Sequence, residues 1–268
     1  MWTWFCRARC TVHDVDTRAG TVRYEDSTGS KTLHLDHVVF ATDPQTAARL
    51  TGDSALIEHT SRERVLGCAG KLTLMFRSPV QWKHGTADPE SDAAFRFVFA
   101  VDTLEAFEAA TLAVVDGEGF APGYFQVYCE GAAMRHMGLA EPYDRLAVFF
   151  KNLALGQIGE QLSAVEAQVK ATILSYIVNP EDCVWSRLLT PRDLQQTFGF
   201  PGGNLEHTML VNGQSYSDRH YAAEANRRFY QFGAFENVSI CGSSTYPCGS
   251  VAGTPGSMCA SELLRHLG

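Results

Sequence analysis

The chain has 268 residues, of which 45% are hydrophobic, enough for one large or two smaller domains with a buried core. Its formal charge of −8 argues against a nucleic-acid or anionic-membrane partner, because phosphate binding requires clustered lysine and arginine. No apolar run reaches the roughly 18 residues of a transmembrane segment. The opening residues also lack the apolar core of a secretory signal, and we expect a cytoplasmic protein.

The cysteines do not form a recognisable metal site. All eight are scattered along the chain, and no two have CxxC spacing. We therefore predict no metal ligands and interpret the cysteines as buried free thiols in a reducing compartment. The spacing of Cys241 and Cys248 leaves a redox disulfide as an alternative.

The first part of the chain alternates β-rich runs with turn residues. Between Val12 and Ala41 the runs are separated by TRAG and DSTG, which supply turn chemistry at close spacing. This pattern predicts a β-meander that ends in a buried strand at residues 38–41. PQTAARL predicts a short helix that follows, with Pro44 at its first position.

The middle of the chain is predicted to hold several strands and one long helix. The runs KLTLMFRSPV, FRFVFAVD, GYFQVYCEG and RLAVFFKNLAL indicate strands, and LEAFEAATLA indicates a short helix. Apolar residues recur at three- and four-residue steps from Leu162 to Tyr176, which predicts an amphipathic helix over residues 157–177. The Asn179-Pro180 pair ends it.

Helix boundary signals also mark the last third of the chain. In TPRDLQQTFG, Thr190 is a candidate N-cap, Pro191 occupies the first position, and Gly199 is a stop signal. NVSICGSS predicts a strand, and residues from about 254 to 267 predict a last helix. Because strands and helices mix without strict βαβ alternation, we predict an α/β (α+β mixed) fold with a mixed sheet.

The stretch ICGSSTYPCGSVAGTPGS places a glycine-rich loop between that strand and the last helix. At such a junction the first helical N–H groups lack internal partners, and the helix dipole is positive. Glycines let a ligand approach the main chain, so the junction suits a phosphate or an electron-rich ring edge. It also suits a plain tight connection that needs positive φ angles, and both interpretations stay open on the residues alone.

The order of residues in this loop resembles the C-terminal flavin-binding motif of phytoene desaturase-like FAD-dependent oxidoreductases. That family includes carotenoid desaturases and the pyridine nucleotide-disulfide oxidoreductase domain-containing protein 2 type. Two further segments resemble the family in the same order: LHLDHVVFATDP, and TPRDLQQTFGFPGGNLEH with Asn204 and His207 at matching positions. The family's run of three glycines is Cys248-Gly249-Ser250 here, a departure at two positions. The residues that match the loop motif are Gly242, Ser243, Thr245, Tyr246, Pro247, Gly249, Val251, Gly253, Pro255, Gly256 and Ala260.

The resemblance covers nearly the whole chain and implies FAD as the cofactor. It implies part of a Rossmann-like FAD-binding domain in residues 1–52, a substrate-binding domain in residues 53–200, and a return to the FAD-binding domain in residues 201–268. It also implies that Val12 and the turn Thr42-Asp43-Pro44 face the adenine and diphosphate. The residues implied on the flavin side are Gly242, Ser243, Gly249, Ser250, Val251, Ala252 and Pro255.

One family feature does not occur in these 268 residues. The family binds the ADP half of FAD with a strand–GxGxxG–helix unit, and no such pattern is present. GEGFAPG comes nearest, but Pro122 and the strand that follows give it the wrong context. The resemblance therefore implies the C-terminal part of a flavoenzyme, whose first portion is missing or lies on a separate GxGxxG-containing chain.

No acid–base group can be assembled from local spacing, so the catalytic residues are unknown at this stage. His207 follows a Gly/Asn loop, where a histidine either forms a structural hydrogen bond or shuttles protons. Asp14 and Asp16, like Glu181 and Asp182, are interpreted as solvated surface. This does not conflict with redox chemistry, because a bound flavin accepts the hydride itself while the protein binds and orients.

The function that follows from the resemblance is an FAD-dependent oxidoreductase of the desaturase or dehydrogenase type. Its substrate would be a small, apolar molecule that lies against the middle strands, from about residue 71 to 150. A non-catalytic partner subunit, or a degenerate binding module without tightly bound flavin, is the alternative. A different α+β ligand-binding domain is a third.

Overall fold

The computed structural model describes residues 9–62, 66–85, 92–115, 120–139, 141–153, 160–205, 207, 219–223, 228–247 and 253–267. The chain divides into two compact units. Residues 1–65 and 206–268 form one, here called the two-segment unit, and residues 66–205 form the central unit. Each unit has its own apolar core.

The two-segment unit begins with the predicted β-meander. Its strands β1 (Thr11–Asp16), β2 (Thr21–Asp26) and β3 (Gly29–His34) pair in antiparallel order, as the closely spaced turn residues predicted. At the first turn the Asp16 carboxylate accepts hydrogen bonds from the backbone N–H groups of Arg18 and Ala19. This local bond explains why a short polar sequence suffices to reverse the chain.

The strand predicted to end the meander belongs to a different sheet. β4 (Val38–Phe40) pairs in parallel with β10 (Val238–Ile240), and Val39 is half exposed. The predicted strand is therefore present, but its place in the meander and its complete burial are wrong. Its partner β10 lies about 200 residues later in the chain, and no sequence pattern around residue 38 predicts this pairing.

Helices cover the parallel pair in this unit. α1 (Pro44–Thr51) begins at the predicted proline and ends at Gly52, whose φ of 67° is the left-handed conformation typical of a helix C-cap. α2 (Ser54–Arg62), which the sequence patterns did not predict, follows at once, and α8 (Thr254–Leu267) is the predicted last helix. The core of this unit contains Val15, Val22, Phe40, Ala47, Ala48, Leu56, Tyr221, Phe232, Val238 and Ile240.

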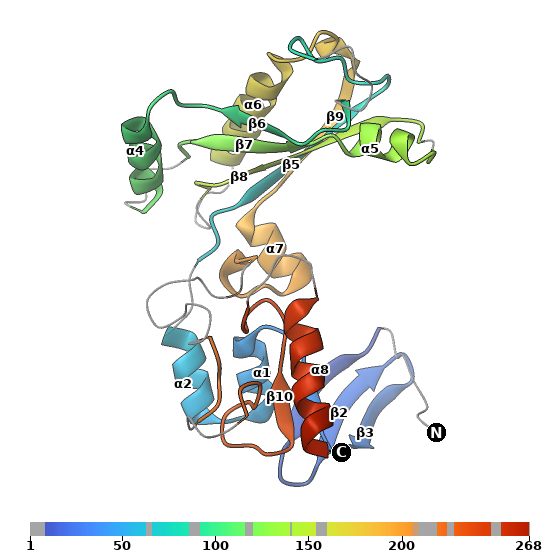
Figure 1. The fold of residues 1–268 in the computed structure, drawn as a ribbon, viewed down its shortest axis with the longest axis vertical. Coiled ribbons are helices and arrows are strands. Elements are labelled where there is room, and N and C mark those ends of the chain that lie inside the picture. The colour runs from blue at the N-terminus through green and yellow to red at the C-terminus, as the bar shows by residue number, and fades with distance from the viewer. Residues whose placement is uncertain are drawn as a thin grey trace. The chain divides into compact units, whose positions relative to one another are not determined.

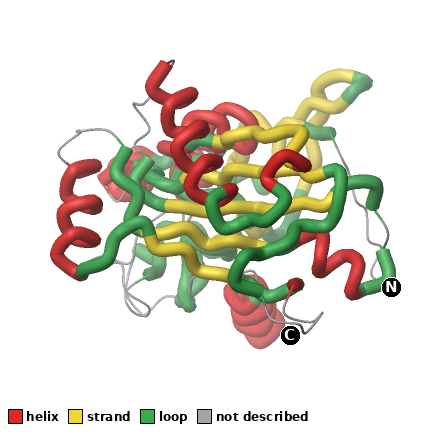
Figure 2. The backbone as a smooth tube through the Cα atoms, turned by 90° about the horizontal axis from the view of Figure 1, so that it is seen from above, coloured by secondary structure: helices red, strands yellow, loops and turns green. Residues whose placement is uncertain are grey.

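The central unit is built on one five-stranded sheet, whose strands lie side by side in Figure 2. The strand order is β6-β7-β8-β5-β9, and every neighbouring pair is antiparallel. The predicted α/β fold class is confirmed, but this sheet is wholly antiparallel rather than mixed. The strands are β5 (Gly70–Phe76), β6 (Arg96–Phe99), β7 (Tyr124–Tyr128), β8 (Asp144–Phe150) and β9 (Cys183–Leu189).

One face of the sheet packs against the long helix α6 (Glu160–Leu174), as Figure 1 shows. Side chains of β5 alternate strictly between buried and half-buried, so Leu72 and Leu74 enter the core while Lys71 and Thr73 point to the other face. The predicted helix over residues 157–177 is confirmed over residues 160–174. It ends at Leu174 rather than at residue 177, and residues 157–159 lie outside the described part. The other helices here are α4 (Leu104–Val115), α5 (Glu130–His136), α7 (Pro191–Phe198) and two 3₁₀ turns, Pro180–Asp182 and Pro201–Gly203.

Two parts of the central unit differ from the sequence predictions. β9 was not predicted, because its sequence shows no clean alternation of apolar and polar residues. Asp182 is not a solvated surface group. Its carboxylate accepts hydrogen bonds from Ser78 and from Asn179, at 3.0 Å for Asn179 Nδ2, and thereby ties the end of β5 to the start of β9. These hydrogen bonds lower the pKa of Asp182.

α7 begins with a complete capping box. Thr190 Oγ1 accepts a hydrogen bond from the Asp193 N–H at 3.2 Å, and Asp193 Oδ2 accepts one from the Thr190 N–H at 2.8 Å. Pro191 occupies the first helical position, and Gly199 ends the helix with a φ of 73°. The sequence predicted both ends, because each depends on residues within one turn of the boundary.

We predict that Thr190→Ala lowers the free energy of unfolding of the central unit by about 1 kcal/mol, because the N–H of Asp193 loses its acceptor. Urea denaturation followed by the fluorescence of Trp82 and Trp185 measures this. Thr190→Ser, which keeps the hydroxyl, is the matched control and is expected to stay close to the parent. Equal losses in both variants would contradict the capping role.

Candidate functional site

The candidate site lies at the edge where the parallel strands of the two-segment unit end. Val238 lies opposite Val38, and Ile240 opposite Phe40, so both strands finish at the same level. The next residue continues the pairing, because the Cys241 N–H donates to the Phe40 carbonyl at 2.8 Å. Two loops therefore start side by side at this edge, one after each strand, and each leads into a helix.

The loop after β4 contains the predicted turn Thr42-Asp43-Pro44. Asp43 is the N-cap of α1, and its buried carboxylate accepts the Thr46 N–H at 2.8 Å. Thr42 donates its hydroxyl to the Asp43 carbonyl at 3.2 Å. The chain's own negative charge thus occupies the N-terminus of α1, where an anionic ligand group would otherwise be favoured.

The loop after β10 leaves its main chain open at Gly242. The φ of Gly242 is 107°, which side chains rarely adopt, and a Cβ built there would approach no described atom closer than the Ala41 carbonyl oxygen, at 3.7 Å. Among the described residues, only that carbonyl oxygen would contact a Cβ added at Gly242. Thr245 closes the turn, since both its N–H and its hydroxyl donate to the Gly242 carbonyl, at 3.1 and 2.9 Å.

Buried polar side chains hold this loop in place. The Ser244 carbonyl accepts a hydrogen bond from Arg219 Nε at 3.0 Å and from the Tyr221 hydroxyl at 3.4 Å. Arg219 is only 1% exposed, so its guanidinium group lies buried against the main chain of this loop. Tyr230 donates its hydroxyl to the Tyr246 carbonyl at 2.7 Å, and burial contributes most to raising the pKa of Tyr230 to about 12.

His207 contacts this loop. Its Nδ1 lies 3.1 Å from Ser244 Oγ, which makes it a hydrogen-bond partner of the loop's buried serine. The structural interpretation of this histidine therefore has a geometric basis. Arg219 and Tyr221 were missed by the sequence predictions, because they follow a polar stretch with no periodic or motif signal.

The predicted cofactor residues fall into three groups. Thr42, Asp43 and Pro44 lie at the same strand edge as Gly242 and Ser243. Val12 lies on β1 opposite Tyr24 and is exposed, and Pro255 is buried in the first turn of α8, which has no acidic side chain. Outside the described residues lie Gly249, Ser250, Val251 and Ala252, which the resemblance implies on the flavin side, and Cys248.

A pair of thiols lies where β10 meets α8. Cys241 and Cys259 pack in one small cluster with Tyr230 and Leu263. All six described cysteines are free, but only Cys129 and Cys259 among them are buried, so the predicted burial is wrong for the other four. The Cys259 thiol donates a hydrogen bond that lowers the pKa of Cys241 to about 7, while the pKa of Cys259 is raised by the same contact. Nearby, Glu262 accepts the backbone N–H groups of Phe229 and Tyr230, both at 3.1 Å.

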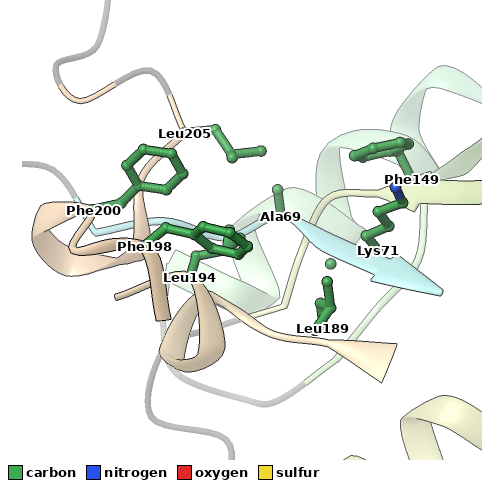
Figure 3. A pocket seen from close by; sticks show the side chains of 9 residues that line it. Ala69, Lys71, Phe149, Leu189, Leu194, Phe198, Phe200 and Leu205 are labelled. Carbon is green, nitrogen blue, oxygen red and sulfur yellow. The ribbon is translucent and has the colours of Figure 1, made fainter. Parts of the chain in front are cut away.

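The central unit contains an apolar cavity on the face of its sheet away from α6. Figure 3 shows its lining, which comes from the ends of β5, β8 and β9 and from the α7 region. The cavity volume is about 290 Å³. The sequence predictions placed a substrate along these strands but did not mark the α7 side. The lining residues are Ala69, Gly70, Lys71, Phe149, Leu189, Leu194, Phe198, Phe200 and Leu205.

The described residues contain neither a recognisable metal site nor a membrane-spanning helix. Over those residues, no three His, Cys, Asp or Glu side chains gather in a way that could hold a metal ion. No helix among them has the length and apolar character needed to cross a membrane.

Comparison with known proteins points to oxidoreductases. No family model matches the chain. Over 80 residues it is 35% identical to pyridine nucleotide-disulfide oxidoreductase domain-containing protein 2 of Rattus norvegicus, and 34% identical to the Mus musculus protein of that name. The aligned stretch is 30% of this chain and 13% of each relative.

Among solved structures, a triple mutant of putrescine oxidase redesigned in cofactor binding superposes with a TM-score of 0.51 at 12% identity. The chain shares the fold of this oxidase. The match covers 96% of the chain but 48% of the oxidase, so the chain spans about half the length of that enzyme. Cyclohexylamine oxidase from Brevibacterium oxydans IH-35A gives a TM-score of 0.49 at 13% identity over the same shares.

We predict that iodoacetamide alkylates Cys241 at a rate that rises with pH through about 7, because the thiolate is the reactive form. Cys259→Ala removes the hydrogen-bond donor, returns the pKa of Cys241 toward its ordinary range, and slows alkylation at pH 7 about tenfold. Mass spectrometry of the reduced protein follows each site.

Cys259→Ser keeps a donor and is the matched control. Cys183, whose pKa burial raises, is the internal reference within every sample. A pH profile of Cys241 that is the same with and without the donor at position 259 would show that the hydrogen bond does not set its reactivity.

Proposed function

We propose that this chain is part of an FAD-dependent oxidoreductase, and that the loop after β10 contacts the flavin. The observation that carries the proposal is the edge at which β4 and β10 end, with an open main chain at Gly242 and a buried arginine beneath the loop. The likeness to putrescine oxidase and to the rat and mouse oxidoreductase-domain proteins supports the same class of reaction.

The residues at this edge fit such a cofactor in two ways. Gly242 provides backbone against which a flat ring can lie, and Arg219 provides positive charge under the loop. Bound flavin would accept a hydride from a substrate C–H bond and would be reoxidised by oxygen, a quinone or another acceptor. The protein would orient the flavin ring and would stabilise the negative charge of the reduced ring. We propose that Gly249 to Ala252 and the start of α8 complete this contact.

We assign the three sequence segments accordingly. Residues 1–52 and 201–268 would serve the cofactor, and residues 53–200 would bind an apolar small-molecule substrate. Because these residues contain no GxGxxG unit and Asp43 caps α1, the proposal requires that the ADP half of FAD be bound mainly by such a unit elsewhere. That unit lies either in the same polypeptide or in a separate chain.

A second candidate is a non-catalytic partner subunit or binding module without tightly held flavin. Two observations favour it: the departures at Cys248 and Ser250 from the family's three glycines, and the carboxylate of Asp43 at the N-terminus of α1. Side chains at positions 248 and 250 leave less room for a ring, and the carboxylate of Asp43 repels a phosphate. The two candidates differ in whether purified protein retains flavin.

The test is to purify the chain alone and after co-expression with a GxGxxG-containing reading frame from the same locus, and to record the visible spectrum. We expect yellow protein on co-expression. Colourless protein in both cases, with added FAD giving no thermal shift, would reject the flavin site and support the binding module. The spectrum of the chain alone tells whether the second unit is needed.

We predict that Gly242→Ala in the co-expressed protein weakens FAD binding at least tenfold, since the added Cβ lies on the open backbone and the φ of 107° strains any side chain. Titration of the apoprotein with FAD, followed by flavin fluorescence, measures it. Gly29→Ala is the matched control in the same unit, because Gly29 has a φ of 113° and open space around it in the β2–β3 turn. Equal effects on FAD affinity in both variants would contradict the placement.

A further inference from the structure

The face of the central sheet away from α6 carries a row of side chains that crosses all five strands. The strand registers put Leu189 beside Lys71, Lys71 beside Phe149, Phe149 beside Gln126, and Gln126 beside Phe97. Directly paired residues of neighbouring strands point to the same face. One line of side chains therefore runs from β9 to the edge strand β6.

Aromatic rings extend this row into a continuous surface. The ring centroids of Phe95 and Phe97 lie 4.7 Å apart, those of Phe95 and Tyr128 lie 4.7 Å apart, and those of Tyr128 and Phe149 lie 5.5 Å apart. Phe97 is 54% exposed and Phe99 is 63% exposed. Large aromatic side chains gathered and exposed on one face usually mark a binding surface, because single exposed rings are common but clustered ones are not.

The row reaches the apolar cavity at Lys71 and Phe149. Among the described residues that line this cavity, Lys71 carries the one charged group, and Figure 3 shows it beside the ring of Phe149. Lys71 Nζ lies 5.2 Å from the centroid of that ring, within the range of a cation–π contact. The cavity volume of about 290 Å³ is close to the lower end for small-molecule sites.

The ammonium group of Lys71 is only loosely paired. Its Nζ lies 4.0 Å from Glu130 Oε1, at the limit of an ion pair, whereas Arg145 Nε donates to the other oxygen of Glu130 at 2.7 Å. Glu130 is thus already held by a closer cation. A ligand carboxylate can approach Lys71 without breaking the shorter of these two contacts.

We propose that this face binds a long-chain monocarboxylate. Its carboxylate would bind Lys71, and its hydrocarbon chain would lie along the rings of Phe149, Tyr128, Phe95 and Phe97, here called the aromatic row. Three strand spacings of about 4.8 Å separate β5 from β6, so the row from Lys71 to Phe97 is roughly 14 Å long, which suits an extended chain. That this ligand is the substrate rests on the proposed oxidoreductase function, whereas its binding does not.

The charge at Lys71 selects among apolar ligands. An amine would place a second positive charge beside Lys71, at a cost in free energy. A neutral hydrocarbon gains no charge-assisted hydrogen bond from Lys71, whose acceptor remains Glu130 at 4.0 Å. A carboxylate forms a charge-assisted hydrogen bond there, while the chain removes the exposed rings from water.

The binding test uses cis-parinaric acid, a fluorescent long-chain carboxylate, and its methyl ester, each titrated into the whole 268-residue chain. We expect saturable binding of the acid and about tenfold weaker binding of the ester, the loss of one charge-assisted hydrogen bond. Lys71→Met is expected to weaken binding of the acid about tenfold and to leave binding of the ester unchanged. Lys71→Arg is expected to keep most of the affinity for the acid. Phe97→Ala is expected to weaken both probes about tenfold.

Matched controls separate the site from general effects. Lys151→Met removes an equal charge from an exposed lysine after β8, and Leu112→Ala shortens an exposed apolar residue on α4, and both should bind like the parent. Thermal melting of each variant confirms that it is folded. Equal affinity for acid and ester in the parent, or no saturable binding of either, would overturn the proposal.

The outcome is independent of the flavin experiment. Parinarate binding in a protein that never retains FAD would support this site and reject the oxidoreductase function. Flavin binding without parinarate binding would reject this site and support the oxidoreductase function.

Discussion

The parallel pairing of β4 with β10 is the constraint on which the two-segment unit depends. It joins positions as far apart in sequence as His37 and Ser239, whose side chains also bond at 3.0 Å across 202 residues. Such a contact closes a very long loop, and its entropic cost is offset by the buried apolar side chains of both strands. Because both strands end at one edge, the loops at Thr42 and Gly242 meet there. The central unit lies between the two strands in sequence and folds around a core of its own.

The two loops at this edge have different electrostatic character. The first ends in Asp43, which places a carboxylate at the N-terminus of α1, and the second lies over the buried positive charge of Arg219. Asp43 therefore disfavours an anionic group at the first loop, whereas the second loop has an arginine bonded to its main chain. Under the proposed function, the flavin ring rather than the diphosphate would lie at the residues that these two strands bring together.

The five-stranded sheet uses its two faces for different purposes. Leu72, Leu74 and their neighbours pack against α6 and form the core, while the alternate positions carry Lys71 and the aromatic row. A sheet whose second face is rich in exposed rings has an apolar surface that water solvates poorly. The loosely paired ammonium group of Lys71 then distinguishes charged from neutral ligands on that surface. Strand alternation and strand register thus determine which side chains share the face of the proposed substrate site.

Interactions between residues close in sequence determine the helix ends and turns of this protein, and these could be predicted. The ends of α7, the start of α1 at Pro44 and the turns of the meander were all predictable, because each depends on a few neighbouring residues that bond to one another. The sequence also predicted that a loop at Gly242 joins a strand to the last helix. Only the tertiary structure decided which strand β4 pairs with, that Arg219 lies beneath the loop, and that Lys71, Phe149 and Phe97 share one row. Those facts depend on contacts between residues distant in sequence, and no local pattern specifies such a partner.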